Sequence, residues 1–423
     1  MTNHKNHRNC LAVAFLSTVL LSPVDAQESA EPPASSNPGT ASFEGNLVDQ
    51  GNTAAKELAA ASGISVGEAT RRLRLMRQAG NAAHRNAKNG ADSLLRPIVK
   101  DGGVVFPRDI SDATSTESGI QAQFDTDLRP SVSMVATKRP VGQLKAEVAR
   151  LSKDLGTPEG VTGIKVNVLD GTLEILSTEA AKTNEALKVK AITLPDFVTV
   201  VQSEPIVLSD TGTAGMTAGL EASSSTCRSG TWGFMAYENG DILKPGLLTA
   251  AHTTRNNALT QLRLGQTSAA TNCGTGTSWQ TRRLDWRGGA FTDRMGIDIA
   301  FHRQTSGTTY SPFFFNGSAN VRVTDVLYPA AGTRVCKYGV KTGKTCGVIE
   351  TDFVWSNGYG FMSSVLVDAS YPLSADLGDS GGPVWFGTNT AVGIEHAQWS
   401  TRKFLYSELQ ALTVHSTGLT IAN

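Results

Sequence analysis

The sequence of 423 residues lacks an excess of charge of either sign. Lysine and arginine number 38, aspartate and glutamate also number 38, and the formal net charge is +0 at pH 7. Proteins that bind nucleic acid or an anionic membrane surface usually carry a basic surplus. The balance therefore indicates neither partner, and we expect the protein to bind neither nucleic acid nor membranes.

Long hydrophobic runs are missing as well. The apolar run at residues 10–21 has about 12 residues, short of the roughly 18 that cross a bilayer. It follows Lys5 and Arg8 and precedes a small residue, Ala26, which is the pattern of a secretory signal. We therefore expect residues 1–26 to be a signal peptide and the protein to be secreted. The next segment, 27–50, is rich in Pro, Ser and Ala and is predicted to be a flexible linker.

Cysteine is scarce, with 5 in the chain, and Cys10 would leave with the signal peptide. The other four, Cys227, Cys273, Cys336 and Cys346, all lie in the C-terminal half. An even number in an exported chain favours disulfides over metal binding. Three connectivities exist, of which local pairing, Cys227 with Cys273 and Cys336 with Cys346, is the simplest. The 7 histidines show no metal-ligand spacing, so we expect no metal and no cofactor.

Residues 51–215, the α/β half, mix helical and strand patterns. Ser65 and Glu68 form a capping box for a helix that Gly80 is expected to end. Apolar residues at helical spacing predict a second helix over 141–151. This half is predicted to be an α/β domain without a catalytic constellation.

Alternating patterns predict the β-strands. Apolar residues alternate on both sides of Asp170 and Gly171, which predicts a hairpin over 164–175. Residues 216–423, the β half, hold many short apolar runs separated by turn residues, a pattern typical of a β-sandwich or barrel. Leucines at helical spacing predict a C-terminal helix over 403–412.

The stretch LGDSGGPVW places Ser380 among turn-forming residues, so by itself it is ambiguous. A serine nucleophile needs an imidazole that takes its proton and a buried carboxylate that orients the imidazole. His252 ends the apolar run PGLLTAAH, and Asp298 begins the run DIAFHR, where a carboxylate is costly unless it is paired. Asp285 and Asp293 are the alternatives, but both lie in polar stretches.

The motifs LLTAAH, DIAF and GDSGGP, in the order His, Asp, Ser, resemble those of the chymotrypsin-like serine proteases. Their spacing, and the segment RVCKYGVKTGKTCG, resemble the bacterial branch typified by alpha-lytic protease and the streptogrisins. The resemblance covers residues 222–423. It implies that residues 216–423 form a protease domain of two six-stranded Greek-key β-barrels with a C-terminal helix.

The same resemblance implies that residues 51–215 are an α/β propeptide, which helps the protease fold, inhibits it and is then removed by autoprocessing. The segment FVTVVQSEP resembles the end of such a propeptide, and cleavage is expected between residues 208 and 222. The mature protein is expected to be a monomeric endopeptidase that acts on proteins or peptides.

The resemblance also assigns roles to single residues. Ser380 would be the nucleophile, His252 the base, and Asp298 the residue that orients the base. The backbone N–H groups of Gly378 and Ser380 would form the oxyanion hole. Thr253 stands where many relatives have cysteine, which leaves Cys273 as the partner implied for Cys227.

The segment GIEHAQW aligns with the strand that binds substrate in these proteases, which implies substrate-binding roles for four residues: Glu395, His396, Ala397 and Gln398. The Glu395 carboxylate could select a Lys or Arg side chain, or it could pair with Arg402 or His396. Two other functions stay open at this point: a non-catalytic binding protein on a protease fold, and an esterase.

Overall fold

The structure is a computed structural model. It describes residues 54–60, 62–89, 91–92, 94–155, 160–208, 217–223, 226–253, 279–283, 296–304, 312–356, 359–414 and 417–422. The predicted signal peptide and linker lie outside these ranges. The described residues all belong to one compact unit, to which all that follows refers. None of the helices in the described ranges combines the length and apolarity that a membrane crossing requires.

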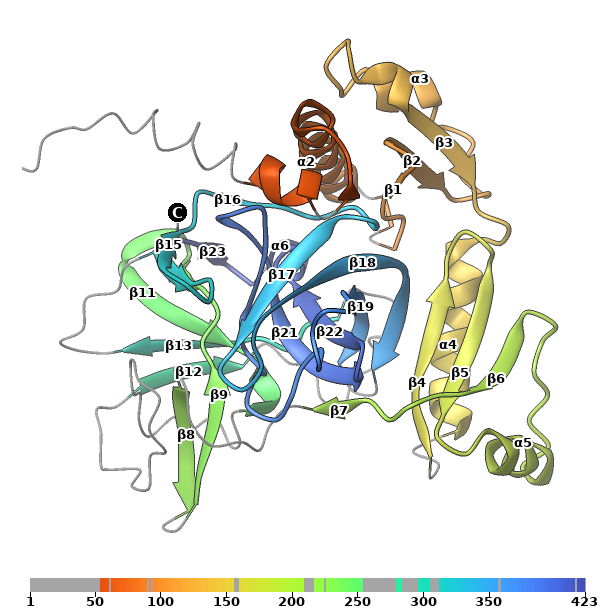
Figure 1. The fold of residues 1–423 in the computed structure, drawn as a ribbon. Helices are drawn as coiled ribbons and strands as arrows, with labels where there is room; N and C mark the ends of the chain where they lie inside the picture. Colours follow the sequence, from red (N-terminus) through yellow and green to blue (C-terminus); the bar gives the residue numbers. More distant parts are fainter. Residues whose placement is uncertain are drawn as a thin grey trace, which may run out of the picture. The chain divides into compact units, whose positions relative to one another are not determined.

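A closed six-stranded β-barrel forms the centre of the β half, drawn in light to dark blue in Figure 1. Around the barrel the strands follow the order β17-β20-β21-β22-β19-β18, and β17 pairs with β18 to close it. The bounds are β17 (Arg334–Gly339), β18 (Gly343–Ser356), β19 (Gly360–Val367), β20 (Pro383–Phe386), β21 (Thr390–Ser400) and β22 (Lys403–Glu408). One of the two predicted barrels is thereby confirmed.

A five-stranded sheet in the order β12-β13-β11-β10-β23 forms the other part of the β half. Its strands are β10 (Met235–Glu238), β11 (Asp241–Thr249), β12 (Trp279–Arg283), β13 (Ala300–Gln304) and β23 (Leu419–Ile421). Shorter elements are the hairpins β8 (Thr217–Ser223) with β9 (Thr226–Thr231) and β14 (Phe313–Phe315) with β15 (Asn320–Arg322), and the strand β16 (Asp325–Val326). A second closed barrel stays a prediction.

The predicted C-terminal helix over 403–412 is wrong for most of its length. Residues 403–408 form strand β22, and only the short α6 (Gln410–Val414) is helical. Phe404 and Tyr406 pack in the same apolar cluster, whereas Leu405 packs in another. A strand buried on both faces has a continuous apolar run, whose periodicity does not distinguish it from a buried helix.

The helix predicted to follow Ser65, α2 (Val66–Lys88), begins as predicted but continues beyond Gly80. The Glu68 N–H donates to Ser65 Oγ over 3.1 Å, so the N-terminal cap is confirmed. A Cβ atom at Gly80 would overlap the Tyr328 carbonyl oxygen. Gly80 therefore allows α2 to approach the β half closely, and it does not end the helix.

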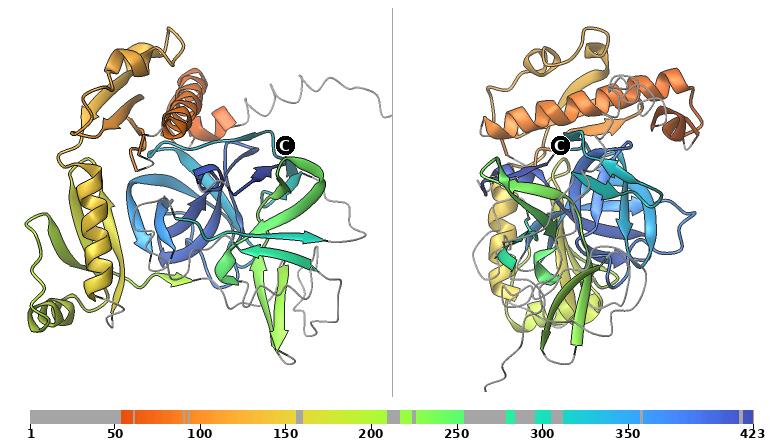
Figure 2. Two further views of the ribbon diagram at one scale, coloured as in Figure 1. Left: turned by 180° about the vertical axis from the view of Figure 1, so that it is seen from behind. Right: turned by 90° about the vertical axis from the view of Figure 1, so that its left-hand side faces the viewer.

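The second helix and the hairpin of the α/β half are confirmed. The helix α4 (Val141–Leu155) buries the predicted apolar face and lies along the hairpin of β4 (Val161–Asn167) and β5 (Thr172–Ser177), as Figures 1 and 2 show. Gly171 has φ +65°, the conformation that the hairpin turn requires. The remaining elements are β1 (Ile98–Lys100), β2 (Gly103–Arg108), α3 (Glu117–Gln121), η1 (Arg129–Ser131), β3 (Val132–Ala136), α5 (Ala180–Val189) and β6 (Val198–Gln202).

The two halves share β-structure. Strand β4 pairs antiparallel with β18, so the sheet β4-β5-β6 continues one wall of the barrel. The N–H of Val99 donates to the Ala331 carbonyl over 2.6 Å, and the Ala331 N–H donates to the Pro97 carbonyl over 2.8 Å. The short β7 (Val207–Leu208), at the end of the α/β half, pairs with β21.

An ion pair between Arg96 and Glu408 is buried where the halves meet. The Arg96 guanidinium donates to Glu408 Oε1 and to Ser363 Oγ, and both charged side chains are 1% exposed. Its carbon lies 4.3 Å from the centre of the Phe353 ring, a distance suited to a cation–π contact. Burial raises the pKa of Glu408, and the charge of Arg96 only partly offsets this. The carboxylate therefore depends on the arginine for its charge compensation.

We expect Arg96→Met to lower the free energy of unfolding of the full chain by about 3–5 kcal/mol, because it leaves Glu408 buried without its cation. The double variant Arg96→Met with Glu408→Met should recover most of this loss, since no charge is left uncompensated. Denaturation with guanidinium chloride measures the free energy of unfolding of the single and the double variant. The control is Arg74→Met, which removes an exposed ion pair with Asp125 and should change little. An Arg96 variant as stable as the Arg74 variant would contradict the prediction.

Candidate functional site

His252, Asp298 and Ser380 come together from three separate segments. His252 lies in the short helix η2 (Ala251–Thr253), Asp298 precedes β13, and Ser380 lies in the loop before β20. The Nε2 atom of His252 lies 2.9 Å from Ser380 Oγ, and its Nδ1 atom bonds to Asp298 Oδ2. The three side chains thus form one continuous hydrogen-bonded chain.

Backbone contacts fix the positions of His252 and Asp298 relative to each other. The His252 N–H donates to Asp298 Oδ1 over 2.8 Å, and the Ala251 N–H donates to the Asp298 carbonyl over 3.2 Å. The N–H of Asp298 in turn donates to Ser407 Oγ on β22 over 2.9 Å. Contacts from both parts of the β half therefore fix the position of Asp298: His252 binds its carboxylate, and strand β22 of the barrel binds its backbone.

The Asp298 carboxylate is fully buried yet ionised. Burial alone would raise its pKa, but the adjacent His252 and His396 more than offset this effect through charge and hydrogen bonds. The pKa of Asp298 therefore lies well below its usual range. A permanently ionised carboxylate at this position keeps the Nδ1–H of His252 in place and leaves Nε2 free to accept a proton.

The loop that carries Ser380 depends on two glycines in the left-handed region. Gly378 has φ +107° and Gly381 has φ +91°, and a Cβ atom at Gly381 would overlap Thr249 Oγ1. Thr231 holds the loop, since its N–H donates to the Ser380 carbonyl and its hydroxyl donates to the Gly378 carbonyl, each over 2.8 Å. Within the described ranges, the N–H groups of Gly378 and Ser380 have no hydrogen-bond acceptor.

A buried lysine, which the sequence analysis did not single out, fixes the residue before Ser380. The Nζ atom of Lys337 lies 2.6 Å from Asp379 Oδ2, and neither side chain is exposed. The N–H groups of Lys341 and Thr342 donate to Asp379 Oδ1, and the Thr342 hydroxyl donates to Oδ2. Burial would raise the pKa of Asp379, but Lys337 and these hydrogen bonds lower it. The sequence held one sign that Lys337 would be buried. Side chains alternate along β17, and this alternation puts Lys337 on the same face as the buried Val335.

The four predicted substrate-binding residues lie on β21. Glu395, His396 and Ala397 are buried and Gln398 is half-buried. The N–H of Gly381 donates to the Glu395 carbonyl, which ties β21 to the Ser380 loop. Strand β7 pairs with the same segment, in the register Ala397 with Leu208 and Gln398 with Val207.

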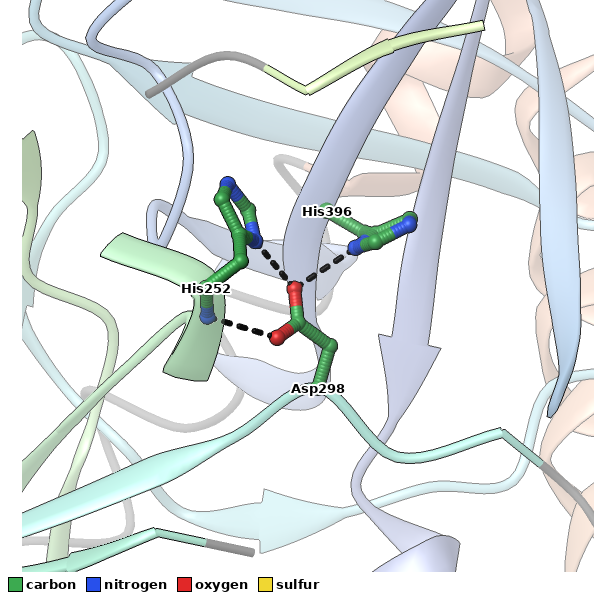
Figure 3. Close-up of side chains that lie close together, drawn as sticks. All are labelled: His252, Asp298 and His396. Atoms are coloured by element: carbon green, nitrogen blue, oxygen red, sulfur yellow. Dashed lines mark hydrogen bonds and ion pairs between the residues drawn. The ribbon is translucent and has the colours of Figure 1, made fainter. Parts of the chain in front are cut away.

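The His396 side chain faces Asp298, not an open pocket. Its Nδ1 atom lies 2.6 Å from Asp298 Oδ2, so the carboxylate stands between two imidazole rings (Figure 3). Arg402, the other partner considered for Glu395, donates to the Val367 carbonyl. The sequence pattern gave no sign that His396 and Asp298 would meet, because they are far apart in the chain.

The chain matches no protein-family model. Two curated proteins, each called uncharacterized and coming from two strains of Mycobacterium tuberculosis, are 38% identical to it over 78 residues. The aligned stretch spans 18% of this chain and only 30% of the length of these relatives.

Several solved structures of proteases are similar to the chain. Thermobifida fusca protease A is 21% identical, with a TM-score of 0.33, over 46% of this chain and 92% of its own. Nocardiopsis protease is 22% identical, with a TM-score of 0.32, over 50% of this chain and 98% of its own. A glutamic acid specific serine protease is 17% identical, with a TM-score of 0.34, over 46% of this chain and 94% of its own.

The chain resembles bacterial chymotrypsin-like serine proteases. At such low identities and TM-scores the likeness carries no functional argument by itself. Any function must rest on the geometry of the side chains at the protease-like site.

One of the two predicted disulfides is confirmed. Cys336 on β17 and Cys346 on β18 occupy directly paired positions and are bonded, with a Cα–Cα distance of 4.0 Å. The bond closes the hairpin that also carries Lys337. The second prediction, Cys227 with Cys273, lies outside the described residues, since Cys273 is not among them.

Two imidazoles and a carboxylate are also a donor set that divalent metal ions accept. The ligand atoms of His252, Asp298 and His396 lie within 4.8 Å of one another. In the structure the Nδ1 atoms of both histidines hydrogen-bond to Asp298 Oδ2. The sequence analysis did not anticipate this cluster, because only the fold brings the two histidines together.

We expect Lys337→Met to destabilise the chain and disorder the Ser380 loop, because Asp379 would stay buried without its cation. In the wild type the pKa of Asp379 is lowered, so its contribution to stability is present above the unfolded-state pKa and lost as the pH falls through the folded-state value. In the variant burial raises that pKa, so the stability deficit should be largest near neutral pH and shrink in acid.

Urea denaturation of both proteins from pH 3 to pH 8 measures this difference. The matched control is Lys341→Met, whose exposed side chain can be removed while its backbone N–H still donates to Asp379. A deficit that is the same at every pH, or equal to that of the control, would show that Lys337 does not neutralise Asp379.

Proposed function

We propose that the chain is a secreted serine endopeptidase, which hydrolyses peptide bonds through Ser380, His252 and Asp298. The observation that carries the proposal is the unbroken hydrogen-bonded chain from Ser380 Oγ through the His252 ring to the Asp298 carboxylate. This arrangement turns a weakly nucleophilic hydroxyl into an effective one, because the imidazole accepts its proton as the bond to carbon forms.

In the proposed reaction, Ser380 Oγ attacks the peptide carbonyl carbon and its proton passes to His252 Nε2. The carbonyl oxygen gains the negative charge, and the free N–H groups of Gly378 and Ser380 are suited to stabilise it. His252 then gives the proton to the leaving amine, and the acyl-enzyme forms. A water molecule attacks the ester in the same way, which releases the acid and restores Ser380. Asp298 stays ionised throughout and stabilises the imidazolium.

The α/β half is proposed to be an inhibitory propeptide. Its last described residues, Val207 and Leu208, are paired as a β-strand with Ala397 and Gln398, on the strand proposed to bind substrate. An extended segment paired with this strand would occupy the place of a substrate backbone. Autoprocessing is proposed to cut the chain after this strand, between residues 208 and 222.

Other parts of the proposal concern where and how the enzyme works. The Cys336–Cys346 disulfide suits an oxidising compartment, in agreement with the proposed signal peptide. The mature enzyme is proposed to act as a monomer on proteins or peptides. A non-catalytic binding protein is not favoured, because the hydrogen-bonded chain is complete. An esterase is not favoured, because the strand pairing of β7 with β21 suits a peptide substrate.

The secreted product should react covalently with a fluorophosphonate probe at Ser380, since the imidazole activates this hydroxyl. Ser380→Ala should abolish the labelling and the cleavage of a peptide library. Ser374→Ala, which changes another buried serine six residues earlier, should leave the labelling in place. A wild-type product that is folded but not labelled would refute the protease proposal, and labelling with ester hydrolysis alone would favour the esterase.

N-terminal sequencing of the secreted protein tests the propeptide. We expect the wild-type product to begin between residues 209 and 222, because β7, which precedes this range, pairs with the strand that is also bonded to the Ser380 loop. The Ser380→Ala chain should instead keep the α/β half, since it cannot process itself. A wild-type product that retains residues 54–208 in full would make the α/β half a permanent domain.

A further inference from the structure

We propose that His396 is a positioning residue of this site, which holds the Asp298 carboxylate for His252 with its ring and orients the Ser380 hydroxyl with its backbone carbonyl. The inference rests on the proposed protease function and deepens it. It also reassigns His396, for which the sequence analysis expected a role in substrate binding.

The geometry requires the His396 ring to be a hydrogen-bond donor to Asp298. An ionised carboxylate can only accept hydrogen bonds, so each imidazole nitrogen that contacts it must carry a proton. Asp298 Oδ2 contacts Nδ1 of both His252 and His396, while Oδ1 accepts the backbone N–H of His252. Three donors thus hold one carboxylate, and the His396 contact comes from a direction that His252 cannot provide (Figure 3).

The fold directs the His396 ring toward Asp298 by means of a β-bulge. Along the β21–β22 ladder, Glu395 pairs with Tyr406 but Ala397 pairs with Leu405, so His396 is an extra residue on β21. Bulges of this kind redirect a side chain that regular alternation would place elsewhere. The bulge therefore points to a specific requirement for the ring at this position.

The neighbouring rings hold His396 in one orientation. Its ring centre lies 4.9 Å from that of Tyr359 and 5.4 Å from that of His252. Its Nε2 atom lies 3.4 Å from Ser356 Oγ, which can donate to it. This partner suits the tautomer with the proton on Nδ1, the same tautomer that Asp298 requires.

Among the residues that the structure describes, the titratable groups against the His396 ring are Asp298, His252 and Tyr359. Burial lowers the pKa of His396, and the charge of Asp298 only partly offsets this effect. This shift disfavours a second positive charge beside the imidazolium that forms on His252, and the contact with Asp298 at Nδ1 needs only the one proton that a neutral ring also carries.

The backbone of the same residue contacts the other end of the catalytic chain. The Ser380 hydroxyl lies 3.1 Å from the His396 carbonyl and 2.9 Å from His252 Nε2, so its one proton has two acceptors. Because one residue contacts both Asp298 and Ser380, a change in the position of His396 alters both ends of the chain together.

The test compares His396→Asn, His396→Gln and His396→Leu in the processed, secreted enzyme. An Asn amide reaches the position of Nδ1 and a Gln amide that of Nε2, so only Asn can still donate to Asp298. We expect Leu and Gln to lower kcat by about 10- to 100-fold, the effect of one lost hydrogen bond to a charged group, with little change in KM. The Asn variant should keep kcat within about threefold of the wild type, because its side-chain amide still donates a hydrogen bond to Asp298.

The pH profile of kcat/KM separates positioning from a purely structural role. With one donor fewer, the Asp298 charge stabilises the His252 imidazolium more strongly, so the acid limb should move to higher pH in the Leu and Gln variants. The Asn variant should keep the wild-type limb. Ser364→Ala, which removes a buried hydroxyl whose partner is Glu350 and not His396, serves as the matched control and should resemble the wild type.

Two outcomes would overturn the inference: equal losses in the Asn, Gln and Leu variants, or an acid limb that does not move in any of them. If the His396→Leu variant does not fold, the comparison of the Asn and Gln variants tests the inference, because both side chains are polar and differ by one methylene. A wild-type enzyme without Ser380-dependent turnover would refute the proposed function itself, a result distinct from any of these.

Discussion

A buried carboxylate must have its charge compensated, and the site depends on this constraint at Asp298. Outside water the ionised group is tolerated only with donors around it. Here the donors are the side chain and backbone of His252 and the ring of His396. To bring them together, the chain has to join a helical turn, a strand start and a β-bulge. The proposed base is oriented as a consequence of the same contacts.

Two further carboxylates obey the same rule near the site. Asp379 is held by Lys337 within the barrel, next to the proposed nucleophile. Glu408 is held by Arg96, which comes from the α/β half. Glu408 directly follows Ser407 on β22, and Ser407 accepts the N–H of Asp298. Strand β22 therefore carries both the charge that the α/β half neutralises and the hydroxyl that accepts the backbone N–H of Asp298.

Strand β21 organises the proposed substrate side of the site. Its backbone binds the Ser380 loop at Glu395, its bulge directs His396 at Asp298, and its open edge pairs with β7. Among its contacts with the β half, the α/β half contributes the buried Arg96 and the extended segment at β7. The first completes a core, and the second covers the strand proposed to bind substrate, which suits a folding partner that is also an inhibitor.

The sequence by itself determined the local elements and the identity of the three proposed catalytic residues. The hairpin around Gly171, the apolar face of α4, the cap at Ser65 and the barrel strands other than β22 follow from short-range patterns, which reflect the geometry of neighbouring residues. Only the tertiary structure decided that Gly80 lies inside a helix, that residues 403–408 form a strand, and that Lys337 and His396 face buried carboxylates. These features depend on which distant segment packs against each residue, and burial between distant segments leaves no local pattern in the chain.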